Sequence, residues 1–198
     1  MQQLIFATNN QHKVAEIRAF LGNGFDIVTL KEAGIDTDIP EPYNTLEENA
    51  RTKSETIYKM TGTDCFGEDT GLEVYTLNGE PGVKSARYAG DGRDFAANID
   101  KLLHNLEGKT DRSARFRTVI SLIINGKEHQ FEGICEGQII GHYRGTAGFG
   151  YDPVFVPEGD TRTFAEMSLE EKNKFSHRGK AMKKLISFLL NKIKHPQQ

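Results

Sequence analysis

Apolar and polar positions follow two different periods along the first thirty residues. The run Leu4–Ala7 is short and apolar, which predicts a buried strand. After a polar turn, apolar residues recur on one helical face until Gly22 and Gly24 end the pattern. These apolar residues are Val14, Ile17, Phe20 and Leu21. The run Phe25–Leu30 predicts a second strand, so the chain opens as β-α-β and favours the α/β class.

The next helix is marked by its N-terminal sequence. Thr45 and Glu48 have the spacing of a capping box, in which two side chains satisfy the first backbone N–H groups of a helix. We expect this helix to continue to about Met60. The apolar segment Cys65–Thr76 then predicts another strand region, which Gly71 interrupts.

A capped helix and a hairpin occupy the middle of the chain. Asp94 is a typical N-cap residue and predicts a helix that ends near Leu106. The segment Arg115–Ile124 contains alternating and β-branched residues, and Asn125-Gly126 is a strong signal for a two-residue hairpin turn. The segment Glu128–Cys135 supplies the returning strand.

The last third of the chain is predicted to be mainly helical. The glycine-rich loop Gly145–Gly150 is followed by a second capping box, formed by Ser168 and Glu171, and a last helix begins after Ser176. The apolar face of that helix is formed by Met182, Leu185, Ile186, Leu189, Leu190 and Ile193. No repeat or linker interrupts the pattern. The fold class is therefore α/β, a mixed β-sheet flanked by helices, in a single domain over residues 1–198.

Composition adds little to this picture but excludes some partners. A chain of 198 residues suits one domain with two lobes. Its 25 basic and 28 acidic residues leave a net charge of −3, which gives no reason to expect sequence-independent binding to nucleic acid. Cys65 and Cys135 fit no metal-ligand pattern and are expected to be buried free thiols. The chain lacks a signal-peptide pattern and a run of ~18 apolar residues, so we expect a soluble, cytoplasmic protein that is not membrane-bound.

The first cluster of polar residues stands where a strand turns into a helix. Its residues are Thr8, Asn9, Asn10, Gln11, His12 and Lys13. Backbone N–H groups at a helix N-terminus form an anion site when a hydroxyl, amides and a lysine lie beside them. The alternative is an ordinary helix cap with a solvated lysine. A Walker A phosphate loop is absent, because in the segment GEPGVKS at 79–85 Val83 separates the last glycine from the lysine.

The second cluster is an acidic pair, Glu68 and Asp69, beside the turn residue Gly71. Adjacent strand residues point to opposite faces, so only one of the two is expected to face a given site. Glu41 stands between two prolines and is a candidate partner that loses little entropy when it is held. Two carboxylates with phosphate oxygens and waters are the usual way to hold Mg²⁺. The alternatives are a solvated or salt-bridged Glu68 and an Asp69 that only closes a turn.

The third cluster is aromatic. Phe149 and Tyr151 flank Gly150 and precede Asp152. Such a pair can grip a planar base, and stacking of a base on an aromatic ring contributes about 1–3 kcal/mol. The alternative is a tight turn whose aromatic rings face the core.

The fourth cluster is basic. Ser176 is a typical N-cap, which places His177 and Arg178 in the first turn of the last helix, with Lys172 shortly before it. Basic residues at this end oppose the helix dipole, so we expect an interaction other than helix formation to hold them.

These clusters together resemble the inosine-triphosphate pyrophosphatase family. The matching segments span nearly the whole chain in the family's order, and six of them in order make coincidence implausible. They are TNNQHK at 8–13, the ENA segment with Lys53, EDTGLEV at 68–74, PGVKSARYAG at 81–90, GFGYDPVF at 148–155 and FAEMSLEEKNKFSHRGKA at 164–181. The resemblance implies an elongated mixed α/β sheet with two lobes, the active site in the groove between them, and a homodimer.

The resemblance also implies an activity and a set of site residues. The substrates are the purine nucleoside triphosphates ITP, dITP and XTP, which are hydrolysed with Mg²⁺ to the monophosphate and pyrophosphate. Asp69 matches the catalytic carboxylate and Glu41 the metal ligand, so that both hold Mg²⁺, and Glu68 is expected to support them. The residues that match triphosphate contacts are Thr8, Asn10, Lys13 and Lys53, and Thr70 matches a further substrate contact. The residues that match the nucleobase and sugar pocket are Phe149, Gly150, Tyr151, Asp152, Lys172, His177 and Arg178.

This sequence departs from the family pattern at two positions. Asn9 stands where many members have glycine, which restricts how closely the backbone approaches a phosphate. Lys84 stands where an aromatic residue is common, which leaves the packing of that loop open.

The residue chemistry suggests a mechanism and a basis for selectivity. Asp69 orients or deprotonates the attacking water, and Lys13 and Lys53 offset the charge on the leaving pyrophosphate. An arginine only donates hydrogen bonds, so Arg178 beside C6 of a purine favours a keto oxygen over the amino group of adenine.

Two other functions remain open at this point. One is the septum-inhibitor type of nucleotide pyrophosphatase, which prefers pyrimidine or modified nucleotides; the SHR element and the FGYDP loop argue against it. The other is a nucleotide-binding sensor without turnover, which is expected to lack Glu41, Asp69 or Lys13. All three are present.

Overall fold

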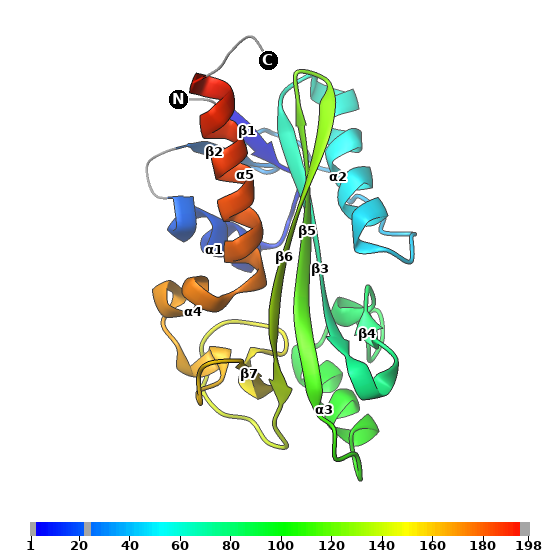
Figure 1. Cartoon of the computed structure of the whole chain (residues 1–198). Coiled ribbons are helices and arrows are strands. Elements are labelled where there is room, and N and C mark those ends of the chain that lie inside the picture. Colours follow the sequence, from blue (N-terminus) through cyan, green and yellow to red (C-terminus); the bar gives the residue numbers. More distant parts are fainter. Residues whose placement is uncertain (1–2, 22–24, 195–198) are drawn as a thin grey trace. The chain divides into compact units, whose positions relative to one another are not determined.

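The computed structural model describes residues 3–21 and 25–194, which form a β-sheet and associated helices (Figure 1). The strands are β1 (Gln3–Phe6), β2 (Asp26–Thr29), β3 (Cys65–Val74), β4 (Pro81–Gly82), β5 (Ser113–Ile124), β6 (Lys127–Ile139) and β7 (Phe155–Pro157). The α-helices are α1 (Gln11–Leu21), α2 (Leu46–Thr61), α3 (Phe95–Asn105), α4 (Leu169–Phe175) and α5 (His177–Lys194). Gly22 and Gly24, which are predicted to end α1, lie outside the described residues.

The sheet is mixed, as predicted. Strand β1 pairs in parallel with β2 and β3, whereas β3 pairs antiparallel with β4 and β6 pairs antiparallel with β7. The strand order is β2-β1-β3-β5-β6-β7, with β4 beside β3. The parallel part comes from two helical crossovers, because α1 connects β1 to β2 and α2 connects β2 to β3.

The chain divides into two compact units. Unit 1 contains Met1–Asp69, Thr118–Gly133 and Arg178–Gln198, and unit 2 contains Thr70–Arg117 and Ile134–His177. Strands β3, β5 and β6 each contribute residues to both units. The two predicted lobes correspond to these units. The groove predicted for the active site, and the assignment of residues 1–198 to a single pyrophosphatase domain, stay predictions.

Helices cover both faces of the sheet in unit 1. Strand residues alternate between faces, so Leu4 and Phe6 pack in one core with α1 and α5, whereas Ile5 packs in another with Ile57 of α2. The rings of Phe6 and Phe66 stack with their centroids 4.5 Å apart. Burial on both faces explains why these short strands are continuously apolar rather than alternating.

Unit 2 has a single hydrophobic core. It combines β3, β5 and β6 residues with α3 and with the segment that follows β6. Its large buried side chains include Leu72, Ile99, Leu102, Leu106, Phe155 and Phe164. Asp94 begins α3 as predicted, because its carboxylate accepts a hydrogen bond from the backbone N–H of Ala97 at 3.1 Å.

Other local predictions are confirmed at the ends of elements. Ser168 and Glu171 form a complete capping box at α4. Thr45 caps α2 by accepting from the backbone N–H of Glu48, but the Glu48 carboxylate accepts from the Thr45 hydroxyl instead of from the backbone N–H of Thr45. Asn125 and Gly126 both have positive φ, as a two-residue hairpin turn requires.

Three predictions about elements are wrong. Gly71 does not interrupt β3; a side chain there would come within 2.6 Å of the Gly82 carbonyl oxygen, so glycine permits the close approach of β4. Strand β6 continues past Cys135 to Ile139. Leu190 is 46% exposed, because it lies one residue past the buried Leu189 and is rotated off the apolar face of α5. The side chain of Ile193 lies outside the described residues.

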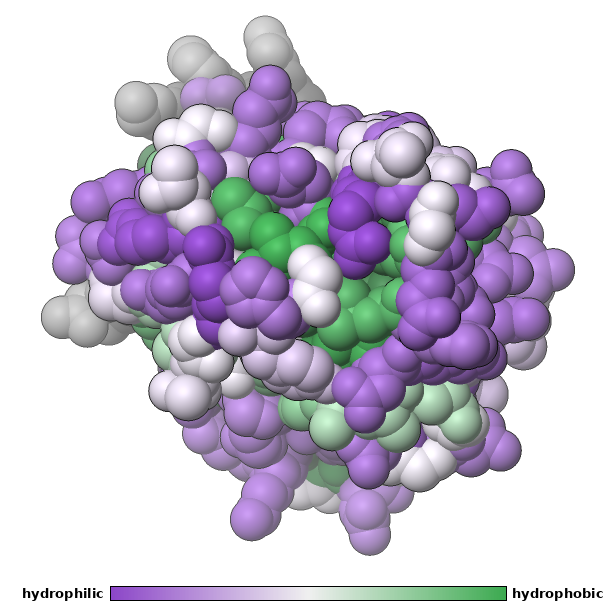
Figure 2. Space-filling view, turned by 90° about the horizontal axis from the view of Figure 1, so that it is seen from below, coloured by the Kyte–Doolittle hydropathy of each residue, from purple (hydrophilic) through white to green (hydrophobic). Residues whose placement is uncertain are grey.

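Hydrophilic side chains cover most of the face shown in Figure 2, and a smaller group of hydrophobic residues is visible near its centre. Large hydrophobic side chains that are exposed in the described part of the chain are Tyr43, Met60, Tyr75, Phe95, Tyr143, Leu169 and Leu190. Among the helices described, none combines the length and the apolar character that crossing a membrane requires.

Candidate active site

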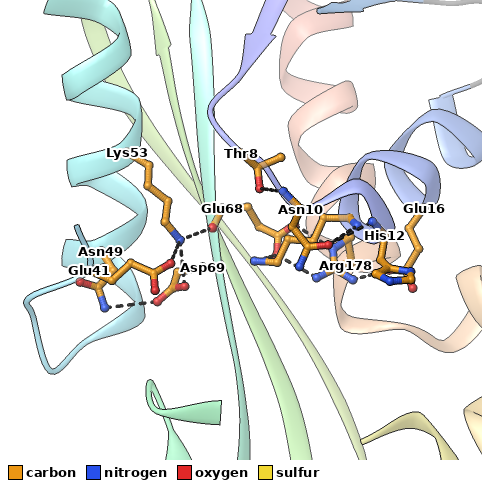
Figure 3. Close-up of polar contacts among 11 residues, drawn as sticks. Thr8, Asn10, His12, Glu16, Glu41, Asn49, Lys53, Glu68, Asp69 and Arg178 are labelled. Atoms are coloured by element: carbon orange, nitrogen blue, oxygen red, sulfur yellow. Dashed lines mark hydrogen bonds and ion pairs between the residues drawn. The ribbon is translucent and has the colours of Figure 1, made fainter. Parts of the chain in front are cut away.

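The side chains of Glu68 and Asp69, adjacent residues of β3, point in opposite directions. Glu68 and Asp69 are both buried, and Figure 3 shows their side chains on opposite sides of the strand. The Asp69 carboxylate meets residues of α2, whereas the Glu68 carboxylate meets Lys13 of α1 and Arg178 of α5. The prediction that only one acid faces a given site is therefore confirmed. Strand alternation turns the Glu68 carboxylate away from Asp69 and Glu41, and Glu68 meets their cluster through its backbone carbonyl, which accepts from Lys53 at 2.9 Å.

Lys53 joins the carboxylates on the Asp69 side. Its Nζ lies 3.1 Å from Asp69 Oδ1 and 2.5 Å from Glu41 Oε1. It also donates to the backbone carbonyl of Glu68 at 2.9 Å. An ammonium group has three N–H donors, so these three acceptors match its whole capacity. The predicted contact of Lys53 with a triphosphate stays a prediction.

Burial and charge together set the protonation of this group of residues. Burial raises the pKa of Asp69, although the positive charges of Lys53 and Lys13 act to lower it. Burial by itself would lower the pKa of Lys53, but the charges of Asp69 and Glu41 outweigh it and raise the pKa above the ordinary lysine value. A buried ammonium between two carboxylates is thereby kept charged.

A glycine determines how closely α2 approaches β3. A side chain at Gly67 would lie 2.5 Å from the carbonyl oxygen of Ala50 and 2.6 Å from Cβ of Lys53. Only glycine therefore allows the helix to lie directly on the strand. Asn49 and Lys53 are one helical turn apart on this contacting face, and each binds one oxygen of Asp69.

The donor set around Asp69 and Glu41 fits a hard divalent cation. No group of three or more histidine, cysteine, aspartate or glutamate residues suited to a metal ion occurs in the described part of the chain. Two carboxylates instead converge on a single positive charge. Mg²⁺ characteristically takes one or two protein carboxylates and completes its octahedron with waters and substrate phosphates. Glu41 and Asp69 therefore suit the predicted ion.

Arg178 is held by two carboxylates on the Glu68 side. Its Nε and Nη2 donate to the two oxygens of Glu68 at 2.8 and 2.9 Å, and its Nη1 donates to Glu16. Burial opposes the charge, but Glu68 and Glu16 raise the pKa of Arg178 above its ordinary value. These bonds explain why a basic residue is stable in the first turn of α5, as the dipole argument predicts.

Lys13 approaches the same carboxylate. Its Nζ lies 3.2 Å from Glu68 Oε1. Burial lowers the pKa of Lys13 below the ordinary value of 10.5, and the charge of Glu68 only partly offsets this.

The N-terminus of α1 is capped by its own side chains. Asn10 Oδ1 accepts hydrogen bonds from the backbone N–H groups of His12 and Lys13 at 3.0 and 3.2 Å. The Thr8 hydroxyl accepts from the backbone N–H of Asn10. The prediction of free N–H groups at this end is therefore wrong for His12 and Lys13. Asn9, Gln11 and His12 are exposed.

Asp152 and Lys172 form a buried ion pair in unit 2. Lys172 Nζ lies 2.6 Å from Asp152 Oδ2, which also accepts from the backbone N–H of Phe149. The same ammonium lies 5.2 Å from the centroid of the Phe149 ring. This arrangement fixes the loop that carries Phe149, whose ring is half-buried.

Tyr151 does not form an aromatic pair with Phe149 on the surface. It is buried in the core of unit 2, and its hydroxyl donates to the Ser85 carbonyl at 2.8 Å. The prediction that Tyr151 stacks on a base is wrong in this structure, and the alternative of a ring facing the core is correct for this residue. The sequence does not distinguish a ring that stacks on a base from a ring that faces the core, because both occur next to glycines.

His177 belongs to unit 2 although its neighbour Arg178 belongs to unit 1. Its ring is buried and stacks on Phe116 with the centroids 4.6 Å apart. Gly150 and Thr70 are half-buried. The structure thus gathers Glu41, Lys53 and Asp69 into one cluster, Lys13 and Arg178 into a second, and Phe149, Asp152 and Lys172 into a third.

Sequence reasoning missed three residues that position these clusters. Asn49 lies within the ENA segment that carries the family resemblance, but its partner on β3 could not be known. Glu16 has no signal beyond a polar residue among the apolar positions of α1, yet it is buried against Arg178. Gly67 directly precedes the acidic pair, and its role depends on the distance between α2 and β3.

Comparisons with known proteins identify the family of this chain. The model of the Ham1 family matches residues 4–188. A dITP/XTP pyrophosphatase of Flavobacterium psychrophilum is 52% identical, over 96% of this chain and 100% of the relative. One of Porphyromonas gingivalis is also 52% identical, over 96% and 98%. The structure of a HAM1 protein from Coxiella burnetii has a TM-score of 0.88 and 38% identity, and covers 96% of this chain and 100% of its own. The resemblance inferred from the six segments is thereby confirmed, and the chain belongs to the Ham1 family.

Proposed function

We propose that this protein hydrolyses ITP, dITP and XTP to the nucleoside monophosphate and pyrophosphate, and so removes deaminated purines from the nucleotide pool. The observation that carries the proposal is the meeting of Asp69 and Glu41 at Lys53 beside β3. It occurs in a chain that is about half identical, over nearly its full length, to relatives named dITP/XTP pyrophosphatase. The predicted homodimer and cytoplasmic location remain predictions.

Glu41 and Asp69 are the residues proposed to hold Mg²⁺. When bound, Mg²⁺ supplies positive charge to the phosphate oxygens and so stabilises the charge that develops during hydrolysis. Lys53 lies between the two carboxylates with all its donors engaged, so we assign it to holding them together against their mutual repulsion.

Asp69 is the proposed catalytic residue. Its burial raises its pKa, which makes its carboxylate a better proton acceptor than an exposed aspartate. Lys53 and Asn49 each bind one of its oxygens, so the orientation of the carboxylate is defined. It would orient the attacking water and accept its proton.

Lys13 and the polar residues before it are proposed to bind the triphosphate. Lys13 follows Thr8 and Asn10 in the sequence, and its side chain is only 14% exposed. Its ammonium would offset negative charge on the leaving pyrophosphate.

The nucleobase is assigned to the third cluster. Phe149 provides a half-buried ring for stacking, and Asp152 and Lys172 hold its loop in place. His177, Gly150 and Thr70 are also proposed to contribute to nucleotide binding. Arg178 keeps its predicted role at C6, with Glu16 and Glu68 fixing the plane of its guanidinium.

Pyrophosphate release tests the proposal directly. ITP, XTP, dUTP, GTP and ATP are offered separately with and without Mg²⁺, and pyrophosphate and orthophosphate are measured. We expect pyrophosphate from ITP and XTP in the presence of Mg²⁺. Orthophosphate as the product would identify a γ-phosphatase, preference for dUTP would favour the pyrimidine-directed type, and binding without turnover would favour a sensor.

Asp69→Asn tests the catalytic assignment. The amide keeps the shape of the carboxylate but cannot accept a proton, so we expect kcat to fall by about 100- to 10,000-fold while the fold is retained. Circular dichroism and steady-state kinetics measure the two effects, with exposed Asp36→Asn as the control. Near-wild-type turnover at saturating Mg²⁺ would remove Asp69 from the mechanism.

A further inference from the structure

Asn49 is a buried side chain to which neither the chemistry above nor the family resemblance assigns a task. It lies in the first turn of α2 with 1% of its surface exposed. Its amide makes two hydrogen bonds to the backbone of a single residue, Tyr43: Oδ1 accepts from the Tyr43 N–H at 3.0 Å and Nδ2 donates to the Tyr43 carbonyl at 3.1 Å. This pairing ties the segment before α2 to the helix.

The same amide reaches Asp69. Nδ2 lies 3.3 Å from Asp69 Oδ2, while Lys53 Nζ binds Asp69 Oδ1. An amide nitrogen has two N–H donors, and the carbonyl of Tyr43 and the carboxylate of Asp69 use both. Only one orientation of the amide satisfies these contacts, because a flipped amide would direct its oxygen at two acceptors.

Tyr43 lies two residues after Glu41, with Pro42 between them. Proline restricts its own φ and the conformation of the residue before it, so fixing the backbone at Tyr43 also restricts where Glu41 can lie. Glu41 Oε1 is 2.5 Å from Lys53 Nζ. A single buried amide is therefore connected to both carboxylates of the cluster, to Asp69 directly and to Glu41 through the backbone.

We propose that Asn49 is a positioning residue that sets the mutual geometry of Asp69 and Glu41. The proposal rests on the function proposed for these two carboxylates. The amide donates to the Asp69 oxygen that Lys53 does not bind, and it holds the Glu41 segment where both carboxylates reach the Lys53 ammonium. Asn49 itself touches neither nucleotide nor water in this scheme.

Asn98 provides a matched control in unit 2. It is buried in α3 and makes the same kind of backbone pairing, since its Oδ1 accepts from Ala89 N–H at 2.7 Å and its Nδ2 donates to the Ala86 carbonyl at 3.1 Å. Among the described residues, the Asn98 amide contacts no carboxylate. Replacing either asparagine by alanine removes a two-point backbone clamp, so the structural cost of the two changes is comparable.

The test compares Asn49→Ala, Asn49→Asp and Asn98→Ala with the wild type. For Asn49→Ala we expect a fall in kcat for ITP of about 10- to 100-fold, little change in KM, and a higher Mg²⁺ concentration for half-maximal activity. Asn98→Ala should lower thermal stability to a similar extent and leave kcat and the Mg²⁺ requirement unchanged. Asn49→Asp keeps the shape and the acceptor for the Tyr43 N–H but cannot donate to Asp69, so its kcat should fall as well.

A measurement without metal or nucleotide completes the design. Amide hydrogen exchange at Tyr43 should accelerate in Asn49→Ala and remain slow in Asn49→Asp, which retains the acceptor. The proposal is overturned if both Asn49 variants fold and keep wild-type kcat and Mg²⁺ dependence, or if Asn98→Ala reduces kcat equally. If Asn49→Ala does not fold, Asn49→Asp alone decides. Absence of pyrophosphate release by the wild type would contradict the proposed function instead, whereas the Tyr43 exchange result would still test the clamp.

Discussion

At the scale of single residues, the chemistry depends on which buried charges share a partner. Asp69 and Glu41 share Lys53, whereas Lys13 and Arg178 share Glu68. Lys53, Glu68, Asp69 and Arg178 are buried, and buried charges are tolerated only when they are paired and hydrogen-bonded. The pKa of each ammonium or guanidinium group is therefore set by its own neighbours. Experiments that change pH or remove one residue can distinguish their contributions.

The pH dependence of kcat/KM should identify Lys13. Its pKa is lowered by burial, so as pH rises through this lowered value the ammonium loses its charge and its attraction for the triphosphate. We expect kcat/KM to begin to decline at a pH below the ordinary lysine pKa. In Lys13→Arg this alkaline decline should move to higher pH, because a guanidinium stays charged. Lys59→Arg, an exposed helix position, is the control. An unmoved limb in Lys13→Arg would show that another group titrates.

Arg178 should be a major determinant of stability. Removing it leaves Glu16 and Glu68 buried without their guanidinium, and breaking such a buried pair costs about 3–5 kcal/mol. Arg178→Ala is therefore expected to lower the free energy of unfolding far more than Arg18→Ala, whose ion pair with Glu32 is nearly half exposed and screened by solvent. Urea denaturation measures both changes. Equal effects of the two substitutions would contradict the assignment of Arg178 to a buried network.

At the scale of elements, the contact between α2 and β3 places the catalytic cluster. Helix α2 carries Asn49 and Lys53 on one face, and β3 carries Gly67 and Asp69 opposite them. The helix begins at Thr45, whose hydroxyl accepts from the Glu48 backbone N–H, so the start of α2 is defined by its own sequence. Its distance from β3 is defined by Gly67, because a glycine has no side chain to separate the strand from the helix.

Gly67→Ala should therefore affect activity as well as stability. The added methyl group would lie within 3 Å of backbone atoms of α2, so the helix must shift away from the strand, at a cost of about 1–3 kcal/mol. The shift moves Lys53 and Asn49 from Asp69, and we expect kcat to fall more than thermal stability alone explains. Gly141→Ala, where an added methyl group meets no atom within 4 Å, is the control. Unchanged kinetics in a folded Gly67→Ala protein would contradict this account.

At the scale of the whole molecule, charge balance limits the possible partners. The net charge is −3, and the basic residues of the two unit 1 clusters are paired with carboxylates rather than exposed as a basic surface. A nucleotide can meet Lys13 locally, but a net charge of −3 gives no electrostatic reason for a long polyanion to bind.

Nucleic acid should accordingly fail to compete with nucleotide. We expect no binding of fluorescently labelled single-stranded DNA at physiological salt by anisotropy, and no inhibition of ITP hydrolysis by unlabelled DNA. Binding that weakens steeply with added salt would contradict this and would indicate a basic surface. An oligonucleotide with a labelled inosine tests whether the base alone is sufficient.

The sequence by itself determined most elements and the identity of the cluster residues. Helix caps, the Asn125-Gly126 turn and the apolar periods depend on neighbours within a few residues, so they can be predicted from the chain. The six matched segments likewise identified the family, whose model covers residues 4–188.

Only the tertiary structure decided which cluster residues meet. It turned Glu68 away from Asp69, placed Tyr151 in the core, and gave Lys53 and Arg178 partners within the protein. These outcomes depend on contacts between residues far apart in sequence, such as Asn49 with Asp69 and Glu16 with Arg178. The physical reason is that buried charges and amides need partners, and the packing of strands and helices decides which residues come within reach. The distance between packed elements cannot be predicted from residues that are neighbours in the sequence.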